Sequence, residues 1–445
     1  MKAKTVATCQ ACGAQMPRWM GRCPECGAWG TVVEELVDRT TAESTGAPAT
    51  QLLAALPADA AERAPSGIGE LDLVLGGGLV DGSIVLLAGE PGVGKSTLAL
   101  QAAVSMGARR EVLVVCGEEA PPQVRARAAR IGPVPESVRT LADPQLGAVL
   151  GAVQSAESSL VVVDSIQTVF DPDIPSAPGS VSQVRECGAR LARAARDSGV
   201  TLLLVGHVTK EGTVAGPRVL EHLVDVVLHF EGDRSSEVRV LRALKNRFGP
   251  TQEVGFFEMR SDGLAPIRDA SAYLLADRHA GLPGSVLAAC VDGRRPFVCE
   301  VQALVADASG PPRRAAVGID SARLPMLIAV LEQRAEMPFK EKDVFVSAVG
   351  GLRVAEPAVD LPVVMAVMSA YTHTSFAEEA VAFGEVGLAG EVRQVVAPDK
   401  RIAEAANVGC TRAFVPRNFS GMQNGLDLHR LGHVRDALDA IGARC

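Results

Sequence analysis

The clearest pattern along the chain is a series of short runs rich in valine, leucine and isoleucine, each followed by glycine or aspartate. Four such runs stand at residues 84–88, 112–116, 160–163 and 201–205. Longer stretches between them mix alanine, leucine and charged residues in the manner of amphipathic helices. Uninterrupted apolar runs are typical of parallel strands that are covered on both faces. The pattern therefore predicts an α/β fold, a doubly wound parallel sheet between two layers of helices.

The first apolar run leads into a glycine-rich loop. The spacing Gly-x-x-x-x-Gly-Lys-Ser, after a strand and before a helix, is typical of a loop that binds nucleotide phosphates. Its glycines allow successive amides to point inward, and the following helix adds its positive N-terminal end. We expect Lys95 to reach the β- and γ-phosphates and Ser96 to bind Mg²⁺. The expected ATP-binding residues are Gly89, Glu90, Pro91, Gly92, Val93, Gly94, Lys95, Ser96 and Thr97.

Acidic residues follow the next two strands. Asp164 ends the run 160–163, where the magnesium-side carboxylate of such enzymes lies. Glu118 and Glu119 follow the run 112–116. Because adjacent side chains at a strand end point to opposite sides, we expect only one of the two to face the γ-phosphate and orient a water molecule. We assign that role of general base to Glu118.

The fourth strand ends at His207 and enters a polar loop that carries Lys210 and Arg218. His207 is a candidate sensor of the γ-phosphate. The sequence is equally compatible with a histidine that is merely hydrogen-bonded at a strand end. Lys210 and Arg218 are candidate DNA contacts in the same loop.

The first 30 residues contain two cysteine pairs with the same spacing, Cys-x-x-Cys, separated by ten residues and each followed by glycine. Two such turns complete a tetrahedral thiolate site for zinc. Because so short a segment has almost no apolar core, we expect metal binding to supply its folding free energy. Arg18, Trp19 and Arg22 lie between the pairs, where they could contact nucleic acid or a partner, or cover the metal. The expected zinc ligands are Cys9, Cys12, Cys23 and Cys26.

Composition narrows the class of protein. A hydrophobic content of 47% with 22% charged residues excludes general disorder. The net charge of −8 gives no global nucleic-acid signature, so any DNA binding must come from local basic surfaces or a central channel. The sequence has no apolar run long enough for a membrane span and no signal-peptide core at its N-terminus, which predicts a cytoplasmic protein.

The order of these motifs is similar to the RecA-like ATPase core, and residues 66–83 look like the entry segment of its RecA, RadA and KaiC branch. The cysteine motif before the core narrows the match, as does the sequence KNRFG after it. Together they resemble the bacterial RadA family, also called Sms, of DNA repair and recombination ATPases. In relatives serine commonly follows the glutamate pair, whereas this chain has Ala120. The KNRFG residues are Lys245, Asn246, Arg247, Phe248 and Gly249.

This resemblance implies an ATP hydrolase that forms a ring, typically hexameric, and uses ATP, Mg²⁺ and Zn²⁺. It implies a DNA-dependent motor on single-stranded DNA that drives branch migration of recombination intermediates alongside RecA. Lys245 and Arg247 would share one face of an extended strand while Asn246 points away. In a ring these two cations could enter the neighbouring subunit's ATP site and stabilise the transferring phosphoryl group, and DNA contact in the channel is their rival role.

The C-terminal third is similar to the proteolytic domain of Lon proteases, an α+β domain. Ala358 stands where the nucleophilic serine would be, and a gapless alignment puts Asp399 at the position of the lysine, with Lys400 beside it. Because alanine has no oxygen to attack a peptide, we expect a scaffold without protease activity. Arginine pairs at Arg294, Arg295, Arg313 and Arg314 are candidate DNA contacts, although solvated hairpin arginines are more common.

The expected organisation has four parts: a zinc finger at 1–30, a linker at 31–65, the ATPase domain at 66–268 and the Lon-like domain at 269–445. Two other functions are alternatives to the recombination ATPase. One is an ATP-dependent Lon-like protease, which Ala358 disfavours. The other is a signalling ATPase of the KaiC type, which the cysteine motif and the single phosphate loop disfavour.

Overall fold

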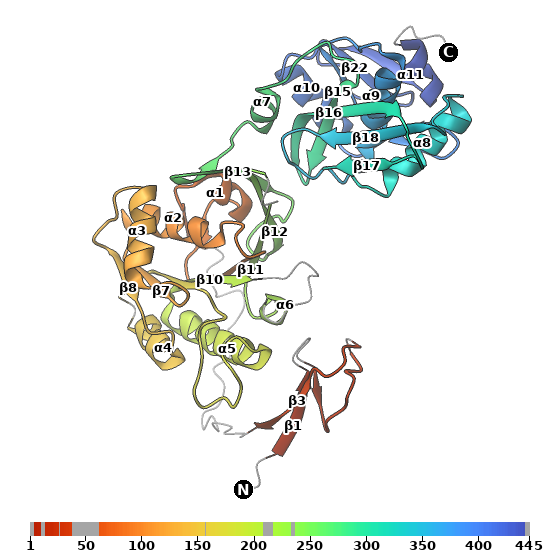
Figure 1. Cartoon of the computed structure of the whole chain (residues 1–445). Coiled ribbons are helices and arrows are strands. Elements are labelled where there is room, and N and C mark those ends of the chain that lie inside the picture. The colour runs from red at the N-terminus through yellow and green to blue at the C-terminus, as the bar shows by residue number, and fades with distance from the viewer. Residues whose placement is uncertain are drawn as a thin grey trace, which may run out of the picture. The chain divides into compact units, whose positions relative to one another are not determined.

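A computed structural model of the chain describes residues 4–9, 14–25, 27–37, 62–155, 157–207, 217–232 and 236–440 (Figure 1). The chain divides into two units. The first comprises Met1–Glu231 and Arg239–Pro266, and the second comprises Gly232–Val238 and Ile267–Cys445.

The first unit is built on a nine-stranded sheet in the order β14-β13-β12-β11-β6-β10-β9-β7-β8. The strands β11, β6, β10, β9, β7 and β8, which are neighbours in this order, all run parallel to one another. β12 then runs antiparallel to β11, so the sheet is mixed rather than purely parallel. The strands are β6 (Ile84–Gly89), β7 (Val112–Cys116), β8 (Val138–Leu141), β9 (Leu160–Asp164), β10 (Thr201–His207), β11 (Val226–Glu231), β12 (Val238–Asn246), β13 (Val254–Arg260) and β14 (Gly263–Pro266).

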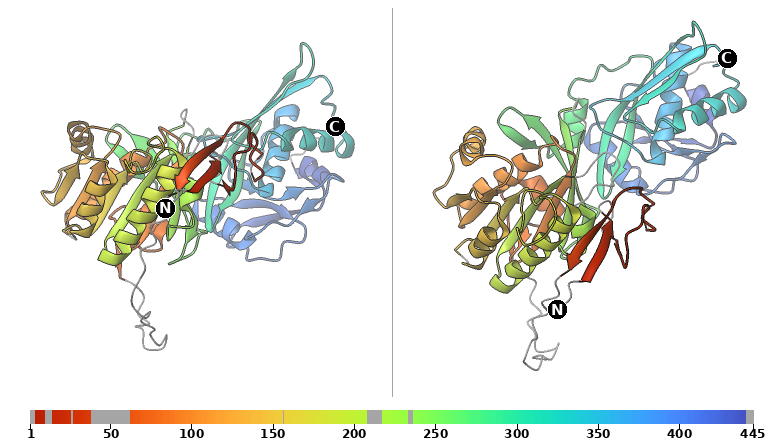
Figure 2. Two further views of the ribbon diagram at one scale, coloured as in Figure 1. Left: turned by 90° about the horizontal axis from the view of Figure 1, so that it is seen from below. Right: turned by 60° about the horizontal axis from the view of Figure 1, so that its bottom comes forward.

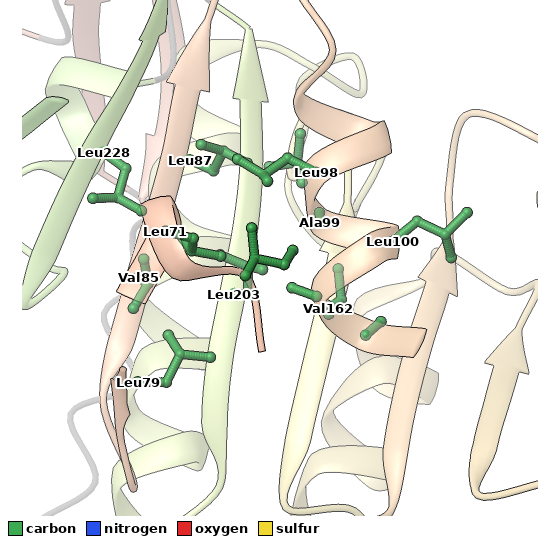
Figure 3. Close-up of a cluster of buried hydrophobic side chains, with 14 of the residues drawn as sticks. Leu71, Leu79, Val85, Leu87, Leu98, Ala99, Leu100, Val162, Leu203 and Leu228 are labelled. Atoms are coloured by element: carbon green, nitrogen blue, oxygen red, sulfur yellow. The ribbon is translucent and has the colours of Figure 1, made fainter. Parts of the chain in front are cut away.

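Helices cover both faces of this sheet because alternate strand residues point to opposite sides. Val85 and Leu87 of β6 pack into one apolar cluster, with three helices (Figure 3). Ile84 and Leu86 pack into a second cluster on the other face, with three further helices. The first layer contains α1 (Gly69–Leu75), α2 (Lys95–Gly107) and α3 (Pro121–Ile131), and the second contains α4 (Leu146–Gln154), α5 (Val181–Ser198) and α6 (Pro217–Leu220). Two short strands, β4 (Arg63–Ala64) and β5 (Leu79–Val80), precede and follow α1 along the chain and pair with each other antiparallel.

The strand register distinguishes two edges of the sheet. Gly89, the last residue of β6, pairs with Phe230 near the end of β11 and with His207 at the end of β10. Because β12 returns in the opposite direction, Asn246 at its end pairs with Val226 at the start of β11. The phosphate loop and the KNRFG motif therefore lie at opposite edges of the same sheet.

The N-terminal segment forms a separate three-stranded antiparallel sheet in the order β2-β1-β3, drawn in red in Figure 2. Its small apolar cluster contains Ala7, Cys9, Met16, Cys23 and Val32. The strands are β1 (Lys4–Cys9), β2 (Gln15–Met16) and β3 (Val32–Val37).

The second unit has a seven-stranded mixed sheet in the order β17-β18-β16-β15-β19-β22-β23, with a two-stranded sheet β20-β21. The apolar helix α9 packs against β15 and β16. The strands are β15 (Ser285–Asp292), β16 (Arg295–Asp307), β17 (Arg314–Val317), β18 (Lys342–Ala348), β19 (Ala380–Ala382), β20 (Glu385–Val386), β21 (Val392–Arg393), β22 (Arg412–Pro416) and β23 (Asp427–Leu431). The helices are α7 (Ala270–Leu275), α8 (Arg323–Arg334), the short 3₁₀ helix η2 (Pro357–Val359), α9 (Asp360–Thr372), α10 (Pro398–Asn407) and α11 (Val434–Ala440).

The α/β core predicted from the apolar runs is confirmed: a phosphate loop at the carboxyl edge of a sheet between two helix layers. None of the helices in the described ranges combines the length and apolar character that a bilayer crossing requires.

Candidate nucleotide-binding site

The phosphate loop connects β6 to α2, and its glycines are required by space and by backbone conformation. A Cβ atom at Gly89 would lie 2.3 Å from the carbonyl oxygen of Phe230. Gly94 has a φ of +111°, and a Cβ atom there would lie 2.6 Å from Cε of Met259. A side chain at Gly89 would clash with the backbone of β11, and the left-handed conformation of Gly94 favours glycine.

Lys95 is the first residue of α2 and is almost fully buried, at 3% exposure. Its Nζ donates a hydrogen bond of 2.9 Å to the carbonyl of Glu90 within the loop. Burial lowers the pKa of Lys95 to about 8, although Glu118, Asp164 and Glu90 act in the opposite direction. The loop thus holds a partly desolvated cation, which a bound phosphate would stabilise.

Ser96 and Asp164 come together from α2 and the end of β9. The Ser96 hydroxyl donates to Oδ1 of Asp164 over 3.0 Å. Burial raises the pKa of Asp164, and the hydrogen bond from Ser96 opposes this shift. A hydroxyl and a carboxylate beside a phosphate loop are the donor set that holds Mg²⁺ in enzymes of this kind, so these residues fit the ion.

The two glutamates after β7 diverge, as their adjacency predicts. One carboxylate oxygen of Glu118 accepts hydrogen bonds from Ser165 (2.5 Å) and from Nε2 of His207 (2.7 Å). The hydrogen bond from His207 is the main reason that the pKa of Glu118 falls to about 2, against the effect of burial. Glu119 instead forms an ion pair with Arg127 of α3.

Two features of this edge were missed by sequence reasoning. Ser165 follows Asp164 directly, yet nothing in the sequence indicated that its hydroxyl would bind Glu118. Arg239 of β12 is buried, and its Nε donates to the carbonyl of Val93 in the phosphate loop over 3.1 Å. The available signal for Arg239 was alternation along β12, which puts it on the same face as the buried Leu241 and Ala243.

A cavity of about 250 Å³ lies beside the first turn of α2. Thr97 of the phosphate loop borders it, together with Arg127 and Arg130 of α3. Its remaining wall is Ile131 and the turn 259–263 between β13 and β14. Gln101 holds that turn on α2, because its side-chain amide exchanges hydrogen bonds of 3.0 and 2.9 Å with the backbone of Leu264.

The predicted DNA-contacting loop is only partly visible. His207 ends β10 as predicted, but Lys210 lies outside the described residues. The backbone of Arg218 belongs to α6, whereas its side chain is outside the described part of the structure. Their proposed contacts with DNA stay predictions.

The KNRFG cations lie at the edge opposite the phosphate loop. Nζ of Lys245 donates to the carbonyls of Glu221 and Val224, each over 2.7 Å. Arg247 pairs with Asp225 over 3.1 Å, so both cations reach the segment that leads into β11. Asn246 points elsewhere: its side chain donates to the carbonyl of Leu75 over 3.3 Å and accepts from the amide of Phe248. Phe248 packs against the core, and Gly249 follows in the turn.

The cysteine motif is described at two of its four positions. Cys9 and Cys23 are both buried, at 0% and 1% exposure. They begin equivalent turns, because the amide of each donates over 2.9 Å to the carbonyl of the residue five positions later, Ala14 and Ala28. Cys12 and Cys26 lie outside the described residues. Two matching turns with buried first thiols fit a tetrahedral thiolate site.

The two positions predicted to correspond to the serine and lysine of Lon proteases, Ala358 and Asp399, do not pair a nucleophile with a base. Ala358 is buried in η2. Asp399 accepts a hydrogen bond from the amide of Met422, and Nζ of Lys400 donates to the carbonyl of Arg294 over 2.9 Å. The adjacent Arg401, which sequence reasoning overlooked, is fully buried and pairs with Glu356.

The candidate DNA-contacting arginines already have partners within the second unit. Arg295 donates to the carbonyls of Ile267 and Arg268 over 3.0 and 2.6 Å. Arg313 pairs with Asp343 over 3.1 Å. Arg314 donates to the carbonyl of Phe339 over 2.8 Å. These contacts account for part of their hydrogen-bonding capacity without DNA.

Comparison with known proteins finds family matches in two parts of the chain. Residues 49–213 match a family described as an AAA domain, and residues 8–34 match a rubredoxin metal-binding domain. Among solved structures, a KaiC-like protein from Pyrococcus horikoshii aligns with 46% of this chain and 99% of its own, at 21% identity and a TM-score of 0.39.

Full-length relatives settle the family. The DNA repair protein RadA of Bacillus subtilis is 43% identical over 98% of each chain. Those of Mycolicibacterium smegmatis and Pseudomonas aeruginosa are also 43% identical, over 99% of this chain. With such identity along nearly the whole length, this chain, a zinc-ribbon segment followed by an AAA-type ATPase domain and a C-terminal unit, belongs to the family of DNA repair proteins called RadA.

Proposed function

We propose that this protein is a DNA-dependent ATPase of homologous recombination and repair that works as a ring on single-stranded DNA. The observation that carries the proposal is the meeting of Ser96, Asp164 and Glu118 at the phosphate-loop edge of the sheet. This set supplies a metal-binding pair and an ionised carboxylate beside a desolvated Lys95, which is what phosphoryl transfer to water requires.

The residues at the phosphate-loop edge have different roles in ATP hydrolysis. Lys95 and the amides of the phosphate loop bind the β- and γ-phosphates, and Ser96 with Asp164 holds Mg²⁺, which neutralises phosphate charge when bound. Glu118 remains ionised at neutral pH, and it orients the attacking water and accepts its proton. His207 holds Glu118 through Nε2 and is placed to respond when a γ-phosphate competes for that bond. The cavity beside Thr97 accommodates the base and ribose.

Lys245 and Arg247 act on the ATP of a neighbouring subunit in this proposal. Their position at the far edge of the sheet supports this, because it separates them from the phosphate loop of their own chain. In a ring, typically a hexamer, that edge would face the next subunit's nucleotide. Cations that enter an active site from a neighbour raise the rate of phosphoryl transfer by roughly 10³-fold or more.

Two further parts complete the proposal. Cys9, Cys12, Cys23 and Cys26 bind one zinc ion, which folds the N-terminal segment. The loop that follows His207, with Lys210 and Arg218, faces single-stranded DNA in the channel. ATP-driven movement along that strand would promote branch migration of recombination intermediates formed by RecA.

The direct test is ATP hydrolysis with and without single-stranded DNA, followed by a branch-migration assay on a three-strand intermediate with and without RecA. We expect strong stimulation by DNA, and loss of both activities in Lys95→Ala and Arg247→Ala. Hydrolysis indifferent to DNA would contradict the proposed motor.

Mixed rings separate action within a subunit from action between subunits. A Lys95→Ala subunit lacks a working phosphate loop but keeps its cations, and an Arg247→Ala subunit has the converse defect. If Arg247 acts on the neighbour, some interfaces in a mixture contain no lesion, and the mixture hydrolyses ATP although neither variant does alone. If Arg247 acts within its own subunit, or only on DNA, mixing restores nothing.

A further inference from the structure

The zinc-ribbon segment carries both tryptophans of the whole chain, Trp19 and Trp29, and neither belongs to its core. Trp19 is 56% exposed and Trp29 is 75% exposed. The side chains packed around Cys9 and Cys23 are instead Ala7, Met16 and Val32. Neither indole belongs to the cluster that packs around Cys9 and Cys23.

The two indoles border the same space. A Cβ atom built at Gly21 would lie 3.8 Å from Cη2 of Trp19 and 4.0 Å from Cζ3 of Trp29. Because Gly21 has no side chain, the space between the rings stays open. A flat ring inserted there could contact both indoles.

Both rings are held in place by polar contacts at their margins. Nε1 of Trp19 donates to the carbonyl of Val32 over 2.8 Å. The guanidinium of Arg22 lies 5.8 Å from the ring centre of Trp29 and is itself held by a 3.0 Å hydrogen bond from Nε to the carbonyl of Gly27. These contacts fix the rings and leave most of their faces to solvent, so less ordering is required when a ligand binds.

The cations beside the rings indicate the chemistry of the ligand. Arg18 precedes Trp19 and is exposed, and Arg22 is exposed beside Trp29. Exposed aromatic rings interleaved with arginines are how proteins bind single strands, since bases stack on the rings and phosphates pair with the cations. Every base has a π-face, so such a surface would be tolerant of sequence.

We propose that Trp19 and Trp29 form an aromatic platform, bordering Gly21, that stacks bases of single-stranded DNA, while Arg18 and Arg22 contact the adjacent phosphates. The platform deepens the proposed function, on which it rests, by giving the zinc-ribbon segment its own DNA contact. It is separate from the loop after His207 and does not depend on ATP.

Tryptophan emission tests the platform directly, because no tryptophan elsewhere in the chain contributes to the signal. The full-length protein is titrated with oligothymidylate, and binding of the same labelled oligonucleotide is followed in parallel by anisotropy. We expect the emission to be quenched with the same midpoint as the anisotropy change, both in wild type and in Lys95→Ala.

Substitutions at Trp29 give the matched comparison, because its indole makes no hydrogen bond within the described residues whereas that of Trp19 does. Trp29→Ala should weaken oligothymidylate binding about 5- to 100-fold, and Trp29→Phe should restore part of it because a phenyl ring still stacks. Leu388→Ala, at an exposed apolar residue of the other unit, should change nothing. Zinc content measured in each variant shows whether the ribbon is folded.

The possible failures are distinguishable. Tight oligonucleotide binding with unchanged emission and an unaffected Trp29→Ala would refute the platform and leave the DNA-dependent ATPase intact. Absence of oligonucleotide binding by either readout would overturn the proposed function as well. Quenching by purified RecA but not by DNA would replace the nucleic-acid ligand with a protein partner and overturn the platform.

Discussion

Two buried cations, Lys95 of the first unit and Arg401 of the second, have different kinds of partner. In the second unit, Arg401 is fully buried and donates to both carboxylate oxygens of Glu356 over 2.9 and 2.5 Å, and to the carbonyls of Ala289 and Val396. In the first unit, buried Lys95 donates one hydrogen bond, to the carbonyl of Glu90 in the glycine-rich loop, which it would exchange for phosphate. A charge satisfied by its own domain supports the fold, whereas a charge with an exchangeable partner is suited to bind a ligand.

The largest effect on stability should come from breaking the ion pair of Arg401 and Glu356. Arg401→Met would leave the half-buried carboxylate of Glu356 beside an apolar side chain, and we expect the unfolding free energy of the second unit to fall by about 3–5 kcal/mol. Calorimetry would show this as a lower transition temperature, while ATP affinity in the first unit stays unchanged. A double variant, Arg401→Met with Glu356→Leu, should regain part of the loss, since no charge is then left unpaired. A loss under about 1 kcal/mol in the single variant would remove the distinction between the clusters.

The next largest effect should be on ATP hydrolysis, at Glu118 beside the phosphate loop. Glu118→Gln keeps the size of the side chain but removes the base, so we expect ATP hydrolysis to fall by about 10²- to 10⁴-fold with nucleotide affinity nearly unchanged. DNA-stimulated phosphate release and equilibrium binding of a fluorescent ATP analogue measure the two quantities.

Glu119→Gln is the matched control for that experiment, because the two glutamates are adjacent but have different partners, His207 for Glu118 and Arg127 for Glu119. We expect only a few-fold change, from the loss of a partly exposed ion pair. Equal losses in both variants would show that the carboxylates act jointly and that the assignment to Glu118 is wrong.

The fold and the local geometry of the site were predictable because they follow from short-range rules. The phosphate loop was identified from its spacing, and alternation along a strand separated Glu118 from Glu119. The same rule gave Lys245 and Arg247 a common direction and turned Asn246 away from them. These inferences need only the chain's own periodicity.

Long-range pairings could not be derived in that way. The partners of Glu118, Ser165 and His207, come from two other strands, 47 and 89 positions further along the chain. Arg401 lies on the apolar face of α10, with Ile402 and Ala405, but the sequence does not reveal its partner Glu356. An arginine on the apolar face of a helix indicates that it has a buried partner, but the pattern does not identify which residue that partner is.

A smaller effect should follow from the pKa of Lys95, which burial lowers to about 8. The protonated form binds phosphate, so affinity is complete below that pKa and declines as the pH rises through it. We expect ATP binding to weaken about tenfold between pH 7 and pH 9. A Lys95→Arg variant stays charged throughout this range and should show no such decline. A flat profile in the wild type would mean that Lys95 is as hydrated as a surface lysine, contrary to its burial.

The smallest expected effect is a null result at Ala358 and Asp399 of the second unit. Ala358→Ser restores a hydroxyl at the Lon-like position, but a serine nucleophile needs a base within hydrogen-bond reach. Asp399 stands at the aligned position and accepts the amide of Met422, and the adjacent Lys400 is bound to the carbonyl of Arg294. We therefore expect no cleavage of unfolded casein by Ala358→Ser, with or without ATP.

The informative comparison for that experiment is the double variant Ala358→Ser with Asp399→Lys, which supplies both groups of the dyad. The Arg401–Glu356 ion pair would remain intact in this variant, because Arg401 donates to Glu356 and to the carbonyls of Ala289 and Val396. We expect this variant to be inactive too, because a dyad also requires donors arranged for the developing oxyanion. Cleavage by the single variant would mean that another side chain already serves as base, and the second unit would then contain a catalytic site rather than a scaffold.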